Sequence, residues 1–222
     1  MPRRTIAIGD IHGCAVAFRA LLEHIDPQPE DTLVLMGDYV DRGPDSCGVL
    51  DTILELREKT RLVPLLGNHD EMLLGALRSA QMRENWLQFG GRATLDSYGP
   101  EATTADIPET HVELLRCCQL YHETSTHLFF HANYDPDLSP AEQPALESRW
   151  LSLRDVIPGE HASGKIAVVA HTPQPDGDIL DLGYLLCVDT GCCYGGFLTA
   201  LWLERGVQWQ VDQDGQLRRG NV

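Results

Sequence analysis

The chain has 222 residues, 43% of them hydrophobic, and a formal net charge of −16. This length suits one domain with a sizeable core, and no apolar run is long enough to span a membrane. The acidity disfavours contact with nucleic-acid backbones, but it is compatible with a phosphate-bearing substrate because bound divalent cations would reverse the local field.

The N-terminus and the cysteines indicate a cytoplasmic protein. Two arginines are followed by an apolar run of only four residues, which is too short for a signal peptide. The chain has seven cysteines, an odd number, and no Cys-x-x-Cys pair. Such a set disfavours both a disulfide framework and a thiolate zinc site. We expect neither membrane nor nucleic-acid partners, and the sequence leaves the oligomeric state open.

Strand and helix patterns alternate in the first third of the chain. Apolar runs at 4–9, 32–37 and 61–67 predict strands, and apolar residues at helical spacing predict helices over 13–25 and 45–58. This order predicts parallel strands joined by right-handed crossovers. The proline in the third run predicts an irregular or edge position for that strand.

The pattern changes after the third strand. Residues 72–120 are predicted to be mostly helical, with a glycine pair that interrupts one helix. Further strands are predicted by apolar runs at 127–132, 166–171, 184–191, 197–204 and 207–211. Short turns join the last three of these runs, which predicts an antiparallel meander. We therefore predict an α/β fold in a single domain over 1–222, with a mostly helical insert at about 72–120.

Metal-binding residue types stand where the strands end. The motifs GDIHG (9–13), GDYVDRG (37–43) and GNHD (67–70) follow the first three predicted strands, and FFHAN and VVAHTP end two later ones. The carboxyl ends of parallel strands meet at one sheet edge, so these residues should converge. The oxygen and nitrogen donors that they bring together are Asp10, His12, Asp38, Asn68, His131 and His171.

A donor set without sulfur suits a pair of metals such as manganese, iron or zinc. Two cations in one site lie about 3.5–4 Å apart, and a carboxylate must bridge them. Asp38, at the end of the central strand, is our prediction for that bridge. One such motif alone would more simply be a turn or a core histidine. Five motifs at strand ends favour a dimetal site, because buried carboxylates without cations would be costly.

Together these motifs resemble the phosphoprotein phosphatase branch of the calcineurin-like metallophosphoesterases. The similarity rests on GDIHG, GDYVDRG and GNHD, followed by FFHA and AHT, and it covers nearly the whole chain. Residues 86–99, with the pattern W…GG…TL.SYG, further resemble small bacterial and phage protein-serine/threonine phosphatases. The resemblance implies a central β-sandwich of mixed sheets flanked by helices, with two divalent ions that are usually manganese.

The resemblance also implies a role for each site residue. One ion is assigned to Asp10, His12 and Asp38, and the other to Asp38, Asn68, His131 and His171. His69 is similar to the family's general acid, and Asp41 is expected to orient it.

Two arginines are expected to bind the substrate phosphate. Arg42 is predicted to clamp phosphate oxygens, with Asn68 beside it. A second clamp is expected ahead of the AHT motif, where Arg149 is preferred to Arg154. Asp70 is expected to cap the helix that follows GNHD.

Two positions depart from the family pattern. The fourth motif reads HAN where HGG or HAG is frequent, and the third ends in Asp70 where eukaryotic members usually have Glu. Neither change removes an expected metal ligand, so the departures concern substrate contacts.

The predicted function is metal-dependent hydrolysis of a phosphomonoester, with a phosphoprotein or a small phosphoester as the substrate. A dimetal-bound hydroxide would attack phosphorus directly, and His69 would protonate the leaving group. A protein-serine/threonine phosphatase is the leading interpretation because of the GDYVDRGPDS motif. The alternatives are a symmetrical diadenosine tetraphosphate hydrolase or other nucleotide phosphohydrolase, and a catalytically silent metal-binding scaffold.

Overall fold

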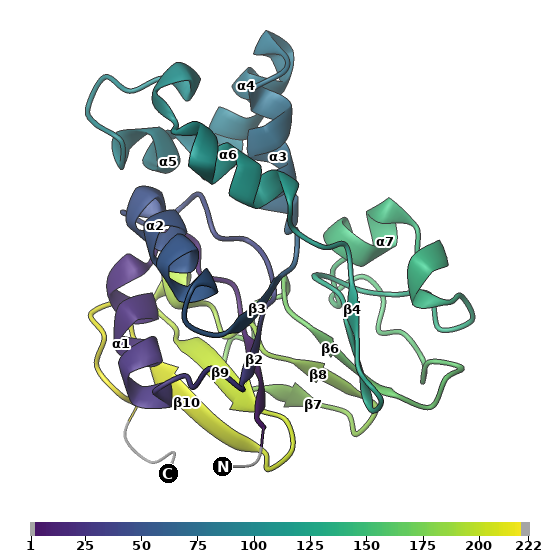
Figure 1. The fold of residues 1–222 in the computed structure, drawn as a ribbon. Coiled ribbons are helices and arrows are strands. Elements are labelled where there is room, and N and C mark those ends of the chain that lie inside the picture. The colour runs from purple at the N-terminus through teal and green to yellow at the C-terminus, as the bar shows by residue number, and fades with distance from the viewer. Residues whose placement is uncertain (1–2, 219–222) are drawn as a thin grey trace.

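Two five-stranded sheets form the centre of the computed structural model, which describes residues 3–218 (Figure 1). The first sheet has the order β10 (Val207–Val211), β9 (Leu198–Trp202), β1 (Thr5–Ile8), β2 (Thr32–Leu35), β3 (Arg61–Pro64). The second has the order β4 (His122–Glu123), β5 (His127–Phe129), β6 (Ile166–Val169), β8 (Leu185–Cys187), β7 (Leu180–Asp181). The predicted β-sandwich of mixed sheets flanked by helices is confirmed.

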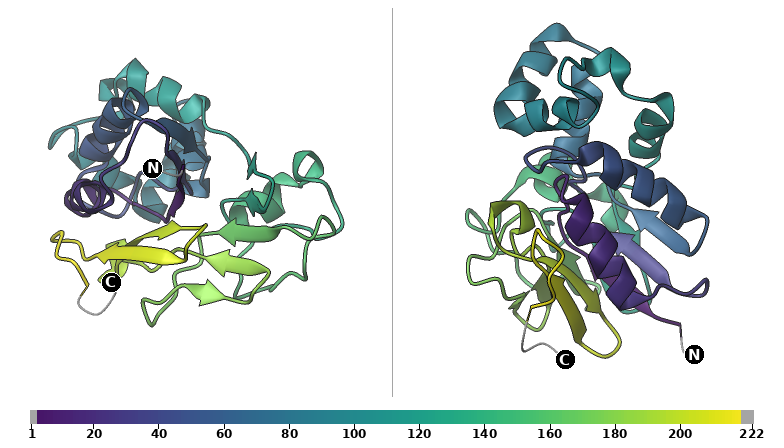
Figure 2. Two further views of the ribbon diagram at one scale, coloured as in Figure 1. Left: turned by 60° about the horizontal axis from the view of Figure 1, so that its bottom comes forward. Right: turned by 90° about the vertical axis from the view of Figure 1, so that its left-hand side faces the viewer.

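Strands β1, β2 and β3 are parallel, as the alternating pattern predicts. Strand β3 lies at the edge of its sheet, which confirms the position that its proline predicts. Helices α1 (Ala15–Ile25) and α2 (Ser46–Arg57) cover one face of this sheet (Figure 2, right). Ile6, Ile8 and Leu33 are buried in the cluster beneath these helices. The first sheet is therefore buried on both faces.

Alternate residues of the same strands fill the layer between the sheets. Ala7 and Val34 of the first sheet are packed in one buried cluster with Phe129 and Val168 of the second. Their neighbours Leu128 and Ala167 belong to a separate cluster on the outer face of the second sheet. The period-2 alternation of strands thus divides the core into layers and fixes the register of both sheets.

The predicted antiparallel meander at the end of the chain is wrong. Strand β8 lies in the second sheet, parallel to β6. Of the three strands predicted for the meander, β9 and β10 pair with each other in antiparallel fashion, while β8 pairs with neither as a strand. Between β8 and β9 the chain turns through Gly191 and Gly195, which have φ of 73° and 86°. This left-handed turn carries the chain from one sheet to the other, a change that short spacing between strands does not reveal.

Helices of the middle segment lie above the sheets in Figure 1. They are α3 (Asn68–Ala76), α4 (Ala80–Trp86), the π-helical η1 (Leu87–Gly91), α5 (Arg92–Asp96), the short η2 (Thr104–Asp106) and α6 (Glu109–Arg116). The glycine pair interrupts the helix as predicted, because Gly90 has a φ of 110°. A Cβ on Gly91 would lie 2.3 Å from the ring of Trp86, so only glycine fits there.

The segment between β5 and β6 contains η3 (Pro140–Glu142) and α7 (Ala145–Trp150), and η4 (Cys192–Tyr194) follows β8.

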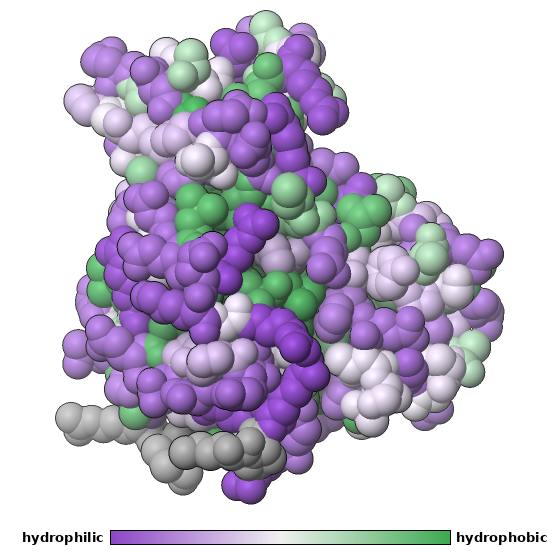
Figure 3. Space-filling view, viewed as in Figure 1, coloured by the Kyte–Doolittle hydropathy of each residue, from purple (hydrophilic) through white to green (hydrophobic). Residues whose placement is uncertain are grey.

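Across residues 3–218, every helix is too short or too polar to cross a membrane. The face drawn in Figure 3 is mostly hydrophilic, with hydrophobic residues gathered where the upper helices meet the sheets.

Candidate active site

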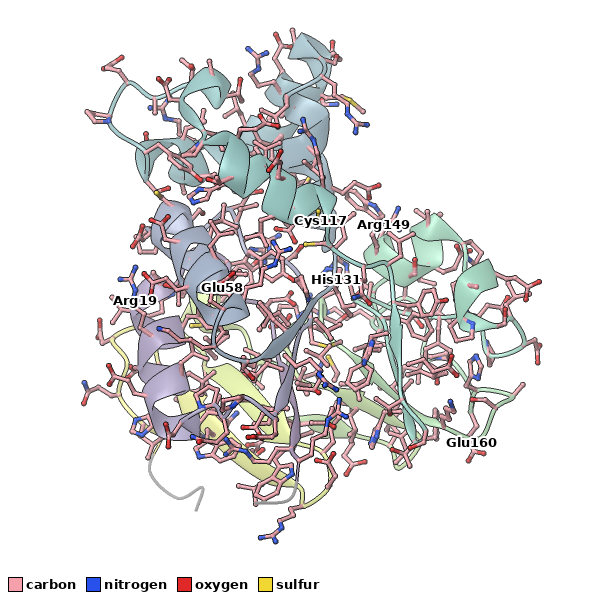
Figure 4. All side chains as sticks on the ribbon, viewed as in Figure 1. Arg19, Glu58, Cys117, His131, Arg149 and Glu160 are labelled. Carbon is pink, nitrogen blue, oxygen red and sulfur yellow. The ribbon has the colours of Figure 1, made fainter. Side chains whose placement is uncertain are left out.

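The ends of five parallel strands bring the predicted site residues together. Asp10, Asp38 and Asn68 follow β1, β2 and β3, while His131 and His171 follow β5 and β6. The structure buries all of these except His171, which is partly exposed. Figure 4 labels His131 near the junction of the sheets with α6 and α7. Residues separated by up to 161 positions therefore share one site.

Two groups of three side chains have the spacing of metal ligands. One contains His12, Asp38 and His69, and the other contains Asp38, His131 and His171, with the ligand atoms of each group within 4.8 Å of one another. Asp38 is common to both groups, which is the geometry that a bridging carboxylate requires. Asp10 is in neither group, but its Oδ1 lies 4.0 Å from His131 Nδ1.

Buried imidazoles direct lone pairs into the site. The Nδ1 atoms of His12 and His131 lie 2.8 Å and 2.7 Å from the carbonyl oxygens of Val40 and Met36. A carbonyl only accepts, so each Nδ1 donates and each Nε2 keeps its lone pair. The Nε2 of His131 faces the Oδ1 of Asn68 at 3.1 Å. Two acceptors that face each other, with the imidazole rings held in orientation by backbone carbonyls, form a suitable cation site.

Burial also keeps these imidazoles neutral near pH 7. It lowers the pKa of His12 to about 3 and that of His171 to about 4, and it lowers the pKa of His131 as well. Neutral imidazole is the form that binds a metal.

Asp189 is a buried carboxylate that sequence reasoning missed. It follows β8 in the stretch VDTG, and its Oδ2 has no hydrogen-bond partner among residues 3–218. Burial raises the pKa of Asp189 to about 7. Burial, followed by the charges of Asp189 and Asp38, raises the pKa of Asp10. The repeated pattern of an apolar strand followed by an acid could have revealed this residue.

Three features of the site fit two divalent cations: it has an excess of buried carboxylates, Asp38 belongs to both groups of candidate ligands, and the acceptor atoms of His131 and Asn68 face each other. The chemistry of this donor set is therefore that of a metal centre.

Asp41 holds His69 beside this centre. The Nδ1 of His69 lies 2.7 Å from Asp41 Oδ2. Trp86 donates its Nε1–H to both oxygens of Asp41 at 2.9 Å, and the Thr94 hydroxyl donates to Oδ1 at 2.7 Å. All four residues are buried. The helical segment above the sheets thus fixes the acid that orients His69, and the motif of 86–99 acquires a physical role.

Strained backbone conformations gather at the same place. His12, Asp38, Asp41, Arg42 and His171 all have φ between 44° and 72°. Among residues 3–218, Asp26 is the only other non-glycine residue with a positive φ. This conformation is disfavoured for residues with a Cβ, and it concentrates at functional sites where the surroundings enforce it.

Asp70 joins the ends of β2 and β3. Its carboxylate accepts from the backbone N–H of Gly67 at 3.0 Å, which confirms the predicted cap of α3. It also accepts from the N–H of Asp38 at 2.8 Å and of Tyr39 at 3.0 Å. These two bonds, which the sequence did not predict, fix the strained residue Asp38 in position.

Three arginines surround the site. The Nη1–H of Arg42 donates to His12 Nε2 at 2.7 Å, so its guanidinium reaches the candidate metal ligands. Arg149, on α7 (Figure 4), forms two hydrogen bonds with Glu71 at 3.1 Å and 3.0 Å. Arg154 lines a recess with Arg42 and His171 and donates to the Pro173 carbonyl at 2.9 Å. Both candidates for the second phosphate clamp therefore lie near the centre, and the choice between them stays a prediction.

Known proteins are similar to this chain in sequence and in fold. The family model of calcineurin-like phosphoesterases matches residues 3–205. A protein of Photorhabdus laumondii named bis(5'-nucleosyl)-tetraphosphatase, symmetrical, is 30% identical over 265 residues, covering 90% of this chain and 94% of that protein. Serine/threonine-protein phosphatase 1 of Salmonella typhimurium is 30% identical over 217 residues, covering 89% of this chain and 90% of that protein.

A crystal structure given as that of a candidate diadenosine tetraphosphatase has the same fold. It superposes with a TM-score of 0.72 at 23% identity and covers 94% of this chain and 93% of that one.

We expect Asp38→Asn to abolish tight binding of both cations. A neutral amide oxygen cannot supply the negative charge that a carboxylate shares between two ions. The measurement is the number of manganese ions per chain after loading and gel filtration, by mass spectrometry of the metal. Asp137→Asn, at an exposed position, is the matched control. An Asp38→Asn chain that holds as much manganese as the wild type would contradict the bridging role.

We expect Trp86→Phe to lower the free energy of unfolding by about 2–4 kcal/mol, because it leaves a cavity and removes a donor from buried Asp41. Urea denaturation followed by circular dichroism measures the change. Trp209→Phe, at a partly buried position on β10, should have a smaller effect. Equal losses of unfolding free energy in the two variants would show that the hydrogen bond to Asp41 adds no stability of its own.

Proposed function

The chain belongs to the calcineurin-like phosphoesterase family, and on that premise we propose that it hydrolyses symmetrical dinucleoside tetraphosphates. The observation that carries this proposal is the similarity over 90% of the chain to a relative named for that activity. Relatives of the same name from Pectobacterium and Shigella also match over about nine tenths of the chain.

This proposal reverses the order of the sequence-based expectation. The GDYVDRGPDS motif put a protein-serine/threonine phosphatase first and the tetraphosphate hydrolase second. The relatives favour the second interpretation, because several tetraphosphatases match about nine tenths of the chain. A protein-serine/threonine phosphatase remains the second candidate, supported by the relative from Salmonella typhimurium and by the motif at residues 86–99.

The proposed centre holds two divalent cations, with manganese as the first choice and iron or zinc as alternatives. When bound, they supply Lewis-acid activation of water and of the phosphoryl oxygens. We assign one ion to Asp10, His12 and Asp38, and the other to Asp38, Asn68, His131 and His171. Neutral imidazoles and ionised carboxylates are the states in which these side chains bind a cation.

Arginines position the substrate phosphates in this proposal. Arg42 reaches the site from the β2 end, and its guanidinium N–H groups can donate to two phosphate oxygens in bidentate fashion. Asn68 lies beside the same phosphate, and Arg149 is proposed as the second clamp. Arg149 is fixed by Glu71, so it would meet the substrate in a fixed orientation. Arg154 is the alternative, because it lines the recess next to Arg42.

His69 delivers a proton to the leaving oxygen. Its Nδ1 is occupied by Asp41, so Nε2 is the nitrogen that can carry the transferred proton. Asp41 is buried, which raises its pKa, while hydrogen bonds from His69, Thr94 and Trp86 act in the opposite direction. Asp41 is therefore a positioning residue that acts through His69.

The proposed domain covers 1–222, of which the structure describes 3–218, so both ends of that range lie outside the described residues. The helices between β3 and β4 occupy the segment proposed as the insert at about 72–120.

We expect manganese-loaded protein to convert diadenosine tetraphosphate and one water into two molecules of adenosine diphosphate. The bond that breaks joins the bridging oxygen to one of the two central phosphorus atoms. In ¹⁸O-water, mass spectrometry should find a single label in half of the product molecules, because water attacks one phosphorus directly. Hydrolysis of a phosphoserine peptide alone would favour the second candidate. No turnover of either substrate or of p-nitrophenyl phosphate would favour the silent scaffold.

We expect His69→Asn to lower kcat/KM by about 10²–10⁴-fold for an alkyl phosphate, whose leaving group needs a proton. The loss for p-nitrophenyl phosphate should be smaller, because nitrophenolate leaves without protonation. The manganese content should remain that of the wild type. His24→Asn, at an exposed position of α1, is the control. An equal loss with both substrates would contradict the general-acid role.

A further inference from the structure

Two recesses adjoin the candidate metal centre. The tryptophan recess, of about 410 Å³, lies between α3, α4 and α7 and is lined by Met72, Met82, Phe89 and Trp150 among others. The tyrosine recess, of about 600 Å³, is lined by residues that include Arg42, Arg154, His171, Pro173 and Tyr194. Both volumes are in the range of small-molecule sites.

Short contacts connect the two recesses. The Nε2–H of His171, in the tyrosine recess, donates to the backbone carbonyl of Trp150 at 3.1 Å. The backbone N–H of Arg42 donates to the carbonyl of Gly90, the residue after Phe89, at 3.3 Å. The recesses therefore meet at Arg42 and His171, which belong to the candidate centre.

The tryptophan recess presents a rigid aromatic surface to solvent. Phe89 is 57% exposed and Trp150 is 38% exposed, and both line this recess. The indole Nε1–H of Trp150 donates to Glu71 at 2.9 Å, and Arg149 holds the same carboxylate with two hydrogen bonds. The indole is thus fixed before any ligand arrives, and little entropy would be lost when a flat ring binds to it.

The tyrosine recess combines an aromatic ring with positive charge. Tyr194 is 60% exposed and lies between Gly191 and Gly195, which both have positive φ. The guanidinium of Arg42 lies 5.3 Å from the centroid of the Tyr194 ring. In a chain with a net charge of −16, this local arrangement of Arg42 and Arg154 favours an anion beside an aromatic platform.

We propose that each recess binds one nucleobase of a dinucleoside tetraphosphate, so that the phosphate chain crosses the metal centre between them. This inference rests on the proposed function and names the contacts that select its substrate. Bases stack on Phe89 and Trp150 at one end and on Tyr194 at the other. A symmetrical substrate has two identical aromatic ends joined by an anionic chain, which matches two aromatic recesses joined at Arg42 and His171. A phosphopeptide has no such pair of ends.

Inhibition by adenosine diphosphate tests the recesses without requiring the proposed reaction. We compare its Ki with that of inorganic pyrophosphate in the hydrolysis of p-nitrophenyl phosphate by the manganese-loaded full chain. Adenosine diphosphate has one base and can place it in either recess, so Phe89→Ala or Tyr194→Ala alone should raise its Ki only about 2-fold. The double variant Phe89→Ala/Tyr194→Ala should raise it about 10-fold, the effect of losing the stacked base. The Ki of pyrophosphate should change less. Titration calorimetry with adenosine diphosphate provides a direct measure of the same loss.

Matched variants separate stacking from other effects. The double variant Phe89→Tyr/Tyr194→Phe keeps both aromatic planes and should keep the affinity of the wild type, whereas Phe89→Leu/Tyr194→Leu keeps apolar volume and should lose it. Leu146→Ala, which removes a 66% exposed side chain of α7 outside both recesses, is the control. If the alanine variants do not fold, the comparison of these two double variants still decides.

The outcomes distinguish this inference from the proposed function. If the wild type cleaves diadenosine tetraphosphate but adenosine diphosphate binds no better than pyrophosphate, the nucleobase sites are wrong and the proposed function stands. If adenosine diphosphate binding depends on Phe89 and Tyr194 but the tetraphosphate is not cleaved, the sites stand and the proposed reaction fails. A loss in Phe89→Ala that affects only phosphopeptide turnover would assign the tryptophan recess to a peptide side chain and overturn the inference.

Discussion

The position of the Asp38 carboxylate is the constraint on which the rest of the site depends. It is the side chain common to both groups of candidate ligands, and it stands at the end of a buried strand with a φ of 53°. A residue with a Cβ adopts that conformation only when its surroundings enforce it. Asp70 does so by accepting from the N–H groups of Asp38 and Tyr39, and the N–H of His69 donates to Asp38 Oδ1 at 2.9 Å. The tips of β2 and β3 therefore fix each other.

Close packing of backbone around this carboxylate explains why the strand tips carry glycines. A Cβ on Gly67 would lie 2.2 Å from Asp38 Oδ1, and a Cβ on Gly37 would lie 2.7 Å from His131 Nδ1. The second sheet approaches through that same histidine, whose Nδ1 contacts the Met36 carbonyl of the first sheet. Glycine is thus required where the two sheets meet, and the apolar layer behind them maintains that approach.

The sequence predicted most of the residues that the structure brings together in the candidate site, because chemistry and position coincide at strand ends. Asp10, Asp38, Asn68, His131 and His171 each follow an apolar run, and parallel strands bring such ends together. The partition of strands between two sheets was not predictable, because β8 and β9 are separated by a short turn and yet lie in different sheets. Asp189 was missed for the same reason. It follows β8, and that strand was assigned to the terminal meander, so its end was not expected to lie at the site. The contacts of Trp86 and Thr94 with Asp41 depend on tertiary packing that no local pattern encodes.

One segment, 86–94, both holds Asp41 and borders the tryptophan recess. Trp86 and Thr94 hold Asp41. Between these two residues, Phe89 lines the tryptophan recess and the Gly90 carbonyl accepts from the backbone N–H of Arg42. The π-helical turn at Leu87–Gly91 allows this, because the positive φ of Gly90 redirects the chain between the two contacts. A change in the tryptophan recess is thereby coupled to the orientation of His69 through a few rigid bonds. With the roles proposed for His69 and for this recess, sequence changes in 86–94 should alter selectivity and proton transfer together, whereas changes in the distant β9–β10 hairpin should alter neither.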